Sequence, residues 1–380
     1  MPNITEGDGE ALQLPSSLDI NKHEANEFKV LFSFLILPSL KAGHCILLLL
    51  WSGIARYISS LSLAFRETVA AYGTDLTWTP MLGLMKRKRR SWQRSSIVLS
   101  ARDSAAGLAF LSLASLISAA DFTTSPTAPP TIVQFGCNSP AEISRATTIL
   151  APYVNGIDIN CGCPQSWACA ETLGAALMHK RELVASMVTA AKNTLASLGY
   201  SDKKTISVKI RIHKDLRQTS DFIRTVEAAG VDFITIHGRT RSTPSHQPVD
   251  LNAIALLAAH TTVPTLSNGD VFSLADALEH VEATGVDGVM SARGILENPA
   301  LFFSTAHSAS TSEGCSWGVV ETFVNNAIRA PIPFKLVVHH LSQMCGSDHS
   351  QSGKTLLTKE QRGRLMACTG LGQVIDLLDE

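Results

Sequence analysis

Residues Gly156–Pro164 read Gly-Ile-Asp-Ile-Asn-Cys-Gly-Cys-Pro, and this stretch indicates how the chain folds. Its apolar first half has the composition of a short buried strand, and the polar Asn160 follows directly. Gly162 permits a tight turn, and Pro164 fixes the backbone just after the thiol of Cys163. Asn160 and Cys163 are therefore expected at the C-terminal end of a strand, where α/β barrels carry their catalytic groups.

Cys161 and Cys163 also allow two simpler interpretations. A zinc site would need a second pair of Cys or His residues at finger spacing, so the CxC pair by itself is a poor zinc signal, and we expect no metal. Free cysteines are usually buried structural residues, and this interpretation suits Cys161. Cys163 lies in the turn after the strand, so we predict that it is catalytic.

Composition limits the possible functions only loosely. A chain of 380 residues can form one large barrel and a small second domain, and we expect a monomer. The net charge is -1 with 17% charged residues, so a nucleic-acid partner would need a local basic patch. The eight cysteines show no disulfide-like spacing, which fits a cytoplasmic protein. The basic run Lys86–Arg90 could be a loop that contacts nucleic acid, a nuclear signal or simply a solvated loop.

The apolar stretch Val30–Ala55 is the segment that most resembles a membrane span. Pro38, Lys41 and His44 interrupt it, so neither half reaches about 18 uncharged residues. A buried strand at Cys45–Leu50 is the stronger interpretation, and no stable membrane association is expected.

From Pro130 onward, short β-rich runs alternate with helical segments, which predicts a parallel sheet covered on both faces. The predicted strands are Thr131–Phe135, Gly156–Asn160, Thr205–Ile210, Asp232–His237, Val263–Ser267 and Val286–Ser291. The predicted helices between them are Ala141–Leu150, Glu182–Leu198, Thr219–Ala229, Leu251–Ala259 and Leu274–Thr284. Two further strands, near Cys45–Leu50 and Thr74–Trp78, would complete a (β/α)8 TIM barrel, an α/β fold.

The pattern changes after Leu301, where three helices are predicted at Trp317–Ile328, Phe334–Cys345 and Lys359–Leu378. We therefore expect a barrel over residues 45–310 and a small helical tail over residues 315–380. Residues 1–44 are expected to be a poorly ordered or mispredicted extension. An atypical insertion at residues 82–120 interrupts the barrel.

Polar side chains follow the predicted strands at their C-terminal ends, which meet at one face of a barrel. Glycine-containing loops after the last two strands, with Gly269 and Gly294, lead into helix N-termini and could bind phosphate together with Arg293. Each loop taken singly also fits an ordinary βα turn. The strand-end residues are Gln134, Asn160, Cys163, Lys209, Arg211, His237, Arg239, Ser267–Asp270 and Ser291–Gly294.

This combination suggests FMN as a bound cofactor. A phosphate site would hold one end of the molecule, and Gln134 could form hydrogen bonds with a planar heterocycle. Lys209 would point into the barrel mouth and stabilise the anionic edge of a reduced flavin. The alternative for Lys209 is a solvated lysine at a strand end.

The chain resembles the tRNA-dihydrouridine synthases, and most of all the eukaryotic branch that acts on neighbouring uridines of the D-loop. The resemblance runs from about Thr131 to Phe302 and resumes at Pro333-Phe334 and His339-His340. The matching segments are Val133–Gly136, Asp158–Ser166, Val208–Arg211, His237–Thr240, Asn268–Val271 and Gly288–Gly294.

The resemblance implies FMN as the cofactor, NADPH or NADH as the reductant and tRNA as the partner. Reduced flavin would pass a hydride from N5 to C6 of a flipped-out uracil, and Cys163 would protonate C5 as a general acid. Asn160 and Arg211 would bind the uracil. Arg239, Arg241 and a tRNA-binding helical tail over residues 315–380 would hold the RNA. The implied flavin ligands are Gln134, Lys209, His237, Asn268, Gly269, Asp270, Ala292 and Arg293.

The N-terminal third departs from the family pattern. The family's first strand ends in Ala-Pro-Met, whereas this chain has Ser52–Ala55 at that point. The family-like segments Ala101–Ser104 and Asp121–Thr124 are separated by the apolar stretch Ala105–Ala120. We hypothesise that residues 1–51 and 105–120 include mispredicted gene-model sequence, such as translated intron, which sequencing of the transcript would test.

Two other functions remain open. One is an FMN barrel that reduces a free pyrimidine or a small enone, and the other is a catalytically impaired barrel that binds tRNA without flavin. The helical tail and the arginines favour a large anionic substrate. Flavin absorbance in the purified protein would exclude the impaired barrel.

Overall fold

The structure is a computed structural model that describes residues 45–47, 62–84, 97–100, 109–113, 122–303, 314–346 and 355–380. The predictions for residues 1–44, for most of the apolar stretch Val30–Ala55 and for the basic run Lys86–Arg90 lie outside the described residues. Within the described residues, no helix combines the length and apolar character that crossing a membrane requires.

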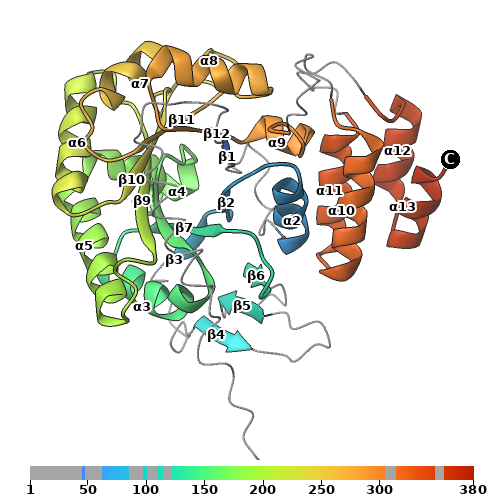
Figure 1. The fold of residues 1–380 in the computed structure, drawn as a ribbon, viewed down its shortest axis with the longest axis horizontal. Coiled ribbons are helices and arrows are strands. Elements are labelled where there is room, and N and C mark those ends of the chain that lie inside the picture. Colours follow the sequence, from blue (N-terminus) through green and yellow to red (C-terminus); the bar gives the residue numbers. More distant parts are fainter. Residues whose placement is uncertain are drawn as a thin grey trace, which may run out of the picture.

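A nine-stranded sheet forms the centre of the molecule, in the order β1-β12-β11-β10-β9-β8-β7-β2, with β3 also paired to β7. Neighbouring strands are parallel, and β1 and β2, at the two ends of this order, lie next to each other. The sheet therefore curls into a barrel, and the predicted TIM-barrel class is confirmed (Figure 1). The strands are β1 (Cys45–Leu47), β2 (Thr77–Trp78), β3 (Leu82–Leu84), β7 (Thr131–Cys137), β8 (Gly156–Cys161), β9 (Thr205–Arg211), β10 (Phe233–His237), β11 (Thr265–Asn268) and β12 (Gly288–Ser291).

Helices cover the outside of the barrel where they were predicted. The helix α6 begins at Leu216 rather than Thr219, because the side chain of Asp215 accepts a hydrogen bond from the backbone N–H of Arg217 and caps the helix. These helices are α3 (Pro140–Leu150), α5 (Arg181–Ser197), α6 (Leu216–Ala228), α7 (Leu251–Ala258) and α8 (Leu274–Thr284). The other helical elements of the described barrel are α2 (Leu63–Ala71), α4 (Ser166–Ala170), α9 (Arg293–Glu297), η1 (Ala151–Tyr153) and η2 (Gly174–His179).

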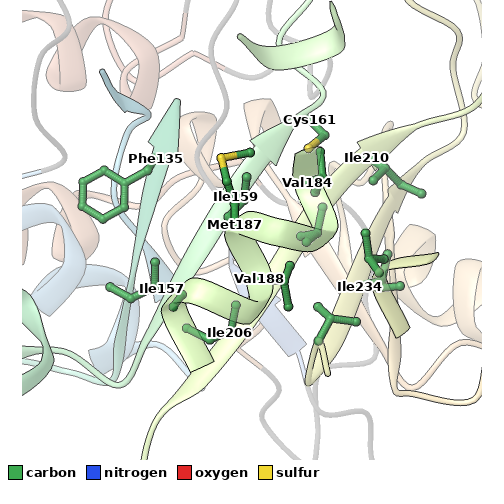
Figure 2. Packing of buried hydrophobic residues seen from close by; sticks show 14 of the residues in the cluster. Phe135, Ile157, Ile159, Cys161, Val184, Met187, Val188, Ile206, Ile210 and Ile234 are labelled. Atoms are coloured by element: carbon green, nitrogen blue, oxygen red, sulfur yellow. The ribbon is translucent and has the colours of Figure 1, made fainter. Parts of the chain in front are cut away.

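The residues of β8 alternate between the two faces of the sheet, and this alternation builds both the core and the site. Ile157, Ile159 and Cys161 pack against the apolar stripe of α5 (Figure 2). Each fully buried aliphatic side chain contributes about 1.5–3 kcal/mol to folding. Asp158 and Asn160 consequently point to the opposite face, into the barrel, and both are fully buried.

Among the described residues, a second sheet has three antiparallel strands: β4 (Ile97–Ser100) and β5 (Ala109–Leu113) lie in the insertion, and β6 (Phe122–Thr124) follows it directly. We predicted no strand within Ala105–Ala120, yet β5 lies there and pairs with a strand on each side. The proposal that this stretch is translated intron stays a prediction.

In the described part of the chain, four helices follow the barrel: α10 (Trp317–Arg329), α11 (Phe334–Met344), α12 (Lys359–Ala367) and α13 (Leu371–Leu378). The single helix predicted for Lys359–Leu378 is wrong, because the backbone is extended at Cys368 and Gly370 and breaks it in two. Glycine favours such a break, since it loses the most conformational freedom in a helix.

The C-terminal helices pack against α2 and α9 of the barrel (Figure 1). The ring of Phe65 in α2 stacks on His340 at a centroid distance of 4.4 Å. The amide of Asn326 donates to the hydroxyl of Thr68 at 2.9 Å. Barrel and tail thus share one continuous apolar cluster.

Candidate active site

A cavity of about 350 Å³ opens at the C-terminal ends of strands β8 to β12. This volume falls within the range of small-molecule sites, about 300–1,000 Å³. All of the individual residues predicted to act as the acid or to contact flavin, uracil or RNA line it, except Gln134 and Asn160. Gly294 of the predicted phosphate loop lines the neighbouring cavity. The lining includes Cys163, Lys209, Arg211, His237, Arg239, Asn268, Gly269, Asp270, Ala292 and Arg293.

Cys163 lies at the edge of this cavity with 8% of its surface exposed. Its backbone N–H and that of Gly162 both donate to the side-chain oxygen of Asn160, at 2.8 and 3.0 Å. Burial raises the pKa of the Cys163 thiol above its ordinary value of 9.0, and nearby Arg211 and Lys209 only partly oppose this. The sulfur therefore carries its proton at neutral pH.

Cys161 has the opposite environment. It is fully buried in the aliphatic core on the outer face of β8, whereas Cys163 packs with Ala168 and Leu173 on the cavity side. Burial, reinforced by the charge of Asp158, raises the pKa of the Cys161 thiol well above 9.0. An inert structural thiol and an accessible one thus lie two residues apart.

Lys209 supplies a buried cation to the cavity. Its side chain is 1% exposed, and it forms no hydrogen bond with any residue that the structure describes. Burial lowers the pKa of Lys209 to about 7, and Arg211 lowers it further, while Asp158 and Cys163 oppose the shift. A buried ammonium without a hydrogen-bond acceptor is costly, so this group is suited to an anionic ligand.

His237 enters the cavity as a neutral ring. Its Nε2 lies 3.2 Å from a guanidinium nitrogen of Arg239, and because arginine only donates, Nε2 accepts and the ring proton is on Nδ1. Burial lowers the pKa of His237 well below 6.5, and the surrounding cations Lys209, Arg211, Arg239 and Arg293 lower it further.

The loops after β11 and β12 form a cationic, glycine-containing cradle. Asp270 joins them by accepting from Arg293 at 2.9 Å and from Arg239 at 2.5 Å. Gly269 has a φ of +122°, which L side chains rarely adopt. A Cβ on Gly294 would lie 2.3 Å from the carbonyl oxygen of Val271, so only glycine lets the two loops approach this closely.

The two predicted substrate arginines are held by the protein itself. Arg239 is 3% exposed and donates to the carbonyl of Gln247 at 2.8 Å as well as to Asp270. Arg211 donates to the carbonyls of Gly162 and Thr240, at 2.7 and 2.9 Å. Arg211 therefore ties the loop after β8 to the loop after β10, and Arg239 ties the loop after β10 to the loop after β11.

Gln134 and Asn160 lie within the barrel beneath the cavity, where they bond to each other at 2.7 Å. Direct contacts of these amides with a flavin or a uracil stay predictions.

The sequence analysis did not predict three features of the site: Asp158, the lining segment Ser242–Ser245, and Phe272 beneath Arg293. A charged residue inside an apolar strand was a signal for Asp158, whereas the lining loop has no pattern that distinguishes it.

The fold and the site define a (β/α)8-barrel enzyme with a protonated thiol in a cationic pocket. The family model described as Dihydrouridine synthase (Dus) matches residues 55–362. The chain belongs to the dihydrouridine synthase family.

Similar proteins include a human one named tRNA-dihydrouridine(20a/20b) synthase (NAD(P)+)-like. It is 37% identical over 84% of this chain and 86% of its own length. A protein of Schizosaccharomyces pombe named tRNA-dihydrouridine(20a/20b) synthase (NAD(P)+) is 36% identical over 84% of this chain and 83% of its own length. The Saccharomyces cerevisiae protein of that name is 36% identical over 78% of this chain and 72% of its own.

Proposed function

We propose that this protein reduces a D-loop uridine of tRNA to 5,6-dihydrouridine, with FMN as the bound cofactor and NADPH or NADH as the reductant. The names of its relatives support the tRNA substrate, the product and the reductant, and they favour positions 20a and 20b. The observation that carries the proposal is the position of the Cys163 thiol at the edge of a cavity lined by Lys209 and arginines, where burial raises the pKa of that thiol.

The side chains of the cavity fit FMN. Lys209 offers a buried cation that lacks a hydrogen-bond acceptor among the described residues, which suits the anionic edge of a reduced flavin. The cradle of Asn268, Gly269, Ala292 and Arg293 suits its phosphate, because glycine loops and arginine are typical phosphate ligands. When bound, FMN would supply the hydride that reduces the uracil ring. His237 lines the same cavity and would contact the ring system.

Cys163 would supply the proton that completes the reduction. Burial keeps its pKa above 9.0, so the acid form predominates at neutral pH and the S–H bond can break toward C5 of the uracil. The resulting thiolate would lie close to Lys209 and Arg211, whose charges favour it, and would regain a proton from solvent. General acids of this kind contribute about 10²–10⁴-fold to a rate. A uridine in folded tRNA must first leave its stack to reach this cavity.

The test is a spectrum followed by a modification assay. The purified protein is expected to be yellow, and with NADPH or NADH it is expected to form dihydrouridine in unmodified tRNA but not in free uridine. Purified protein without bound flavin would contradict the cofactor. Efficient reduction of free uridine would replace tRNA with a small pyrimidine as the substrate.

A further inference from the structure

Asp158 is a buried carboxylate in the middle of β8 that the proposed chemistry does not use. It is fully buried. Its two oxygens accept hydrogen bonds from Ser207 at 2.6 Å and from the amide nitrogen of Gln134 at 2.7 Å. Strand register produces this arrangement, since Gln134 and Ser207 are the residues opposite Asp158 on β7 and β9. Both oxygens act as acceptors, as an ionised carboxylate requires.

A chain of hydrogen bonds leads from this carboxylate to the turn that carries the thiol. Gln134 donates to Asp158 and accepts from the amide nitrogen of Asn160 at 2.7 Å. Asn160 in turn accepts from the backbone N–H groups of Gly162 and Cys163, at 3.0 and 2.8 Å. Every hydrogen bond of this chain is therefore donated in the same direction, from the Gly162-Cys163 turn toward the carboxylate of Asp158.

The direction of donation fixes the orientation of both amides. If the side chain of Gln134 were flipped, its oxygen would face the carboxylate and its NH2 would face the NH2 of Asn160. If Asn160 were flipped, its NH2 would face two backbone N–H groups. The carboxylate cannot donate, so it excludes the flipped orientation of Gln134. With Gln134 fixed, its oxygen faces Asn160 and requires the NH2 of Asn160 there, which excludes the flipped Asn160.

Stability by itself does not account for a charge at this position. A buried carboxylate loses its hydration, and burial indeed raises the pKa of Asp158 despite the bonds from Ser207 and Gln134. Replacement of buried charged groups by apolar residues is often neutral or stabilising. The carboxylate is thus better explained by what it orients than by the stability it adds.

We propose that Asp158 is a positioning residue for Cys163: it holds the amides of Gln134 and Asn160 in the one orientation that ties down the Gly162-Cys163 turn. The thiol is thereby kept at the edge of the cavity. The role of Asp158 in placing the thiol does not depend on which reaction the protein catalyses. Its effect on turnover rests on the proposed function.

The experiment compares the rate at which iodoacetamide alkylates Cys163, followed by mass spectrometry of the peptide, in purified protein saturated with FMN. In Asp158→Ala the turn loses its anchor, and alkylation is expected to be at least about fivefold faster through local opening. Asp158→Asn can donate as well as accept, so it no longer excludes the flipped Gln134, and its alkylation is expected to be faster than in the parent protein but slower than in Asp158→Ala. Ser207→Ala is the matched control: it removes the other partner of the same carboxylate but no link to the turn, and it is expected to stay within about twofold of the parent protein.

Turnover provides a second measurement. Asp158→Ala is expected to form dihydrouridine in tRNA roughly 10–100-fold more slowly, because a misplaced acid loses much of its effect. Reduction of the flavin by NADPH is expected to change less than about threefold, since Cys163 takes no part in that half-reaction. Alkylation needs neither tRNA nor NADPH, so a protein inactive on tRNA would leave this inference testable.

Three results would overturn the inference. The first is alkylation of Asp158→Ala at the parent rate, and the second is an equal acceleration in Ser207→Ala, which would indicate general loosening. The third is alkylation of Asp158→Asn at the parent rate, which would show that a side chain able to donate holds the turn equally well. If Asp158→Ala does not fold, Gln134→Leu interrupts the same chain closer to the thiol and must accelerate alkylation.

Discussion

At the scale of single residues, Cys161 and Cys163 carry the same functional group in different surroundings: Cys161 lies in the core, and Cys163 lines the cavity. Cys163→Ala is expected to retain flavin and its reduction by NADPH, but to lose about 10²–10⁴-fold in dihydrouridine formation. Cys161→Ala removes a sulfur from the core, which is expected to cost about 1 kcal/mol of stability and little activity. Single-turnover assays with tRNA check both variants. An inactive Cys161→Ala beside an active Cys163→Ala would refute the assignment.

Lys209 is expected to lower the stability of the folded protein while it contributes to FMN binding. The folded protein holds the proton of this lysine less tightly than the unfolded chain does, with a pKa of about 7 against 10.5. The cost of burying the ammonium is therefore complete below pH 7 and shrinks as the pH rises toward 10.5. Lys209→Met, in protein freed of flavin, is expected to be more stable by a few kcal/mol, on the order set by the pKa shift, and more so at pH about 6 than at about 9.

Thermal or urea unfolding at the two pH values measures this effect, and flavin retention measures the functional side. Lys209→Met is expected to bind FMN more weakly than the parent protein, because the cation that faces the cavity is gone. A variant that is less stable at both pH values, or that retains FMN fully, would contradict the assigned role.

At the scale of elements, the cradle depends on close packing between the loop after β11 and the start of α9. Gly294→Ala would place a methyl group 2.3 Å from the carbonyl oxygen of Val271 and 2.7 Å from the Cα of Phe272. Backbone must therefore move, and the variant is expected to lose about 1–3 kcal/mol of stability and to retain FMN poorly.

Gly318→Ala is the matched control for that substitution. Gly318 lies exposed in α10, and a Cβ there has no neighbour within 4 Å among the described residues. Alanine at this helical position is expected to add up to about 1 kcal/mol of stability without affecting flavin. Equal flavin retention in the two variants would show that the cradle does not bind the cofactor.

At the scale of the whole molecule, the tail is joined to the barrel by a shared apolar core. Removal of residues after Gly314 would uncover Phe65, Val69 and Ile295 in addition to removing four helices. We therefore expect the truncated chain to aggregate or unfold, although the sequence suggested a separable RNA-binding tail. A soluble truncated barrel with a cooperative unfolding transition would show that the tail is an independent domain.

His340 lies in the same interface between tail and barrel and is expected to make the stability of the protein depend on pH. Its ring lies between Phe65 and Phe323, and neither ring nitrogen has a hydrogen-bond partner in the described structure. Burial lowers the pKa of His340 from 6.5 to about 3. Between these values the histidine is protonated in the unfolded chain but neutral in the folded protein. The free energy of unfolding therefore falls as the pH drops below 6.5.

His340→Phe is expected to raise the free energy of unfolding by about 1–3 kcal/mol, because two unpaired buried nitrogens disappear. The gain is expected to be larger at pH about 5 than at about 7, where the parent histidine is neutral in both states. Urea unfolding at both values provides the measurement. A loss of stability, or a gain independent of pH, would show that the histidine has a partner or is exposed.

The sequence by itself determined the barrel and most of the cavity. Apolar runs of strand length, alternating with helical patterns, allow few arrangements other than a parallel barrel. Period-2 alternation then set which residues of β8 and β9 face inward, so Lys209 was correctly placed at the barrel mouth. These are local properties, and they hold whatever the rest of the chain does.

Only the tertiary structure decided what the inward side chains bond to. Gln134, Asp158 and Ser207 become neighbours through the register of three strands, and Arg239 is held by the loop that follows its own strand. The strand β5 likewise depends on partners, and the break between α12 and α13 depends on packing against the tail core. Hydrogen bonds between residues far apart in sequence depend on register and loop path, and neither is written in the local pattern of any one segment.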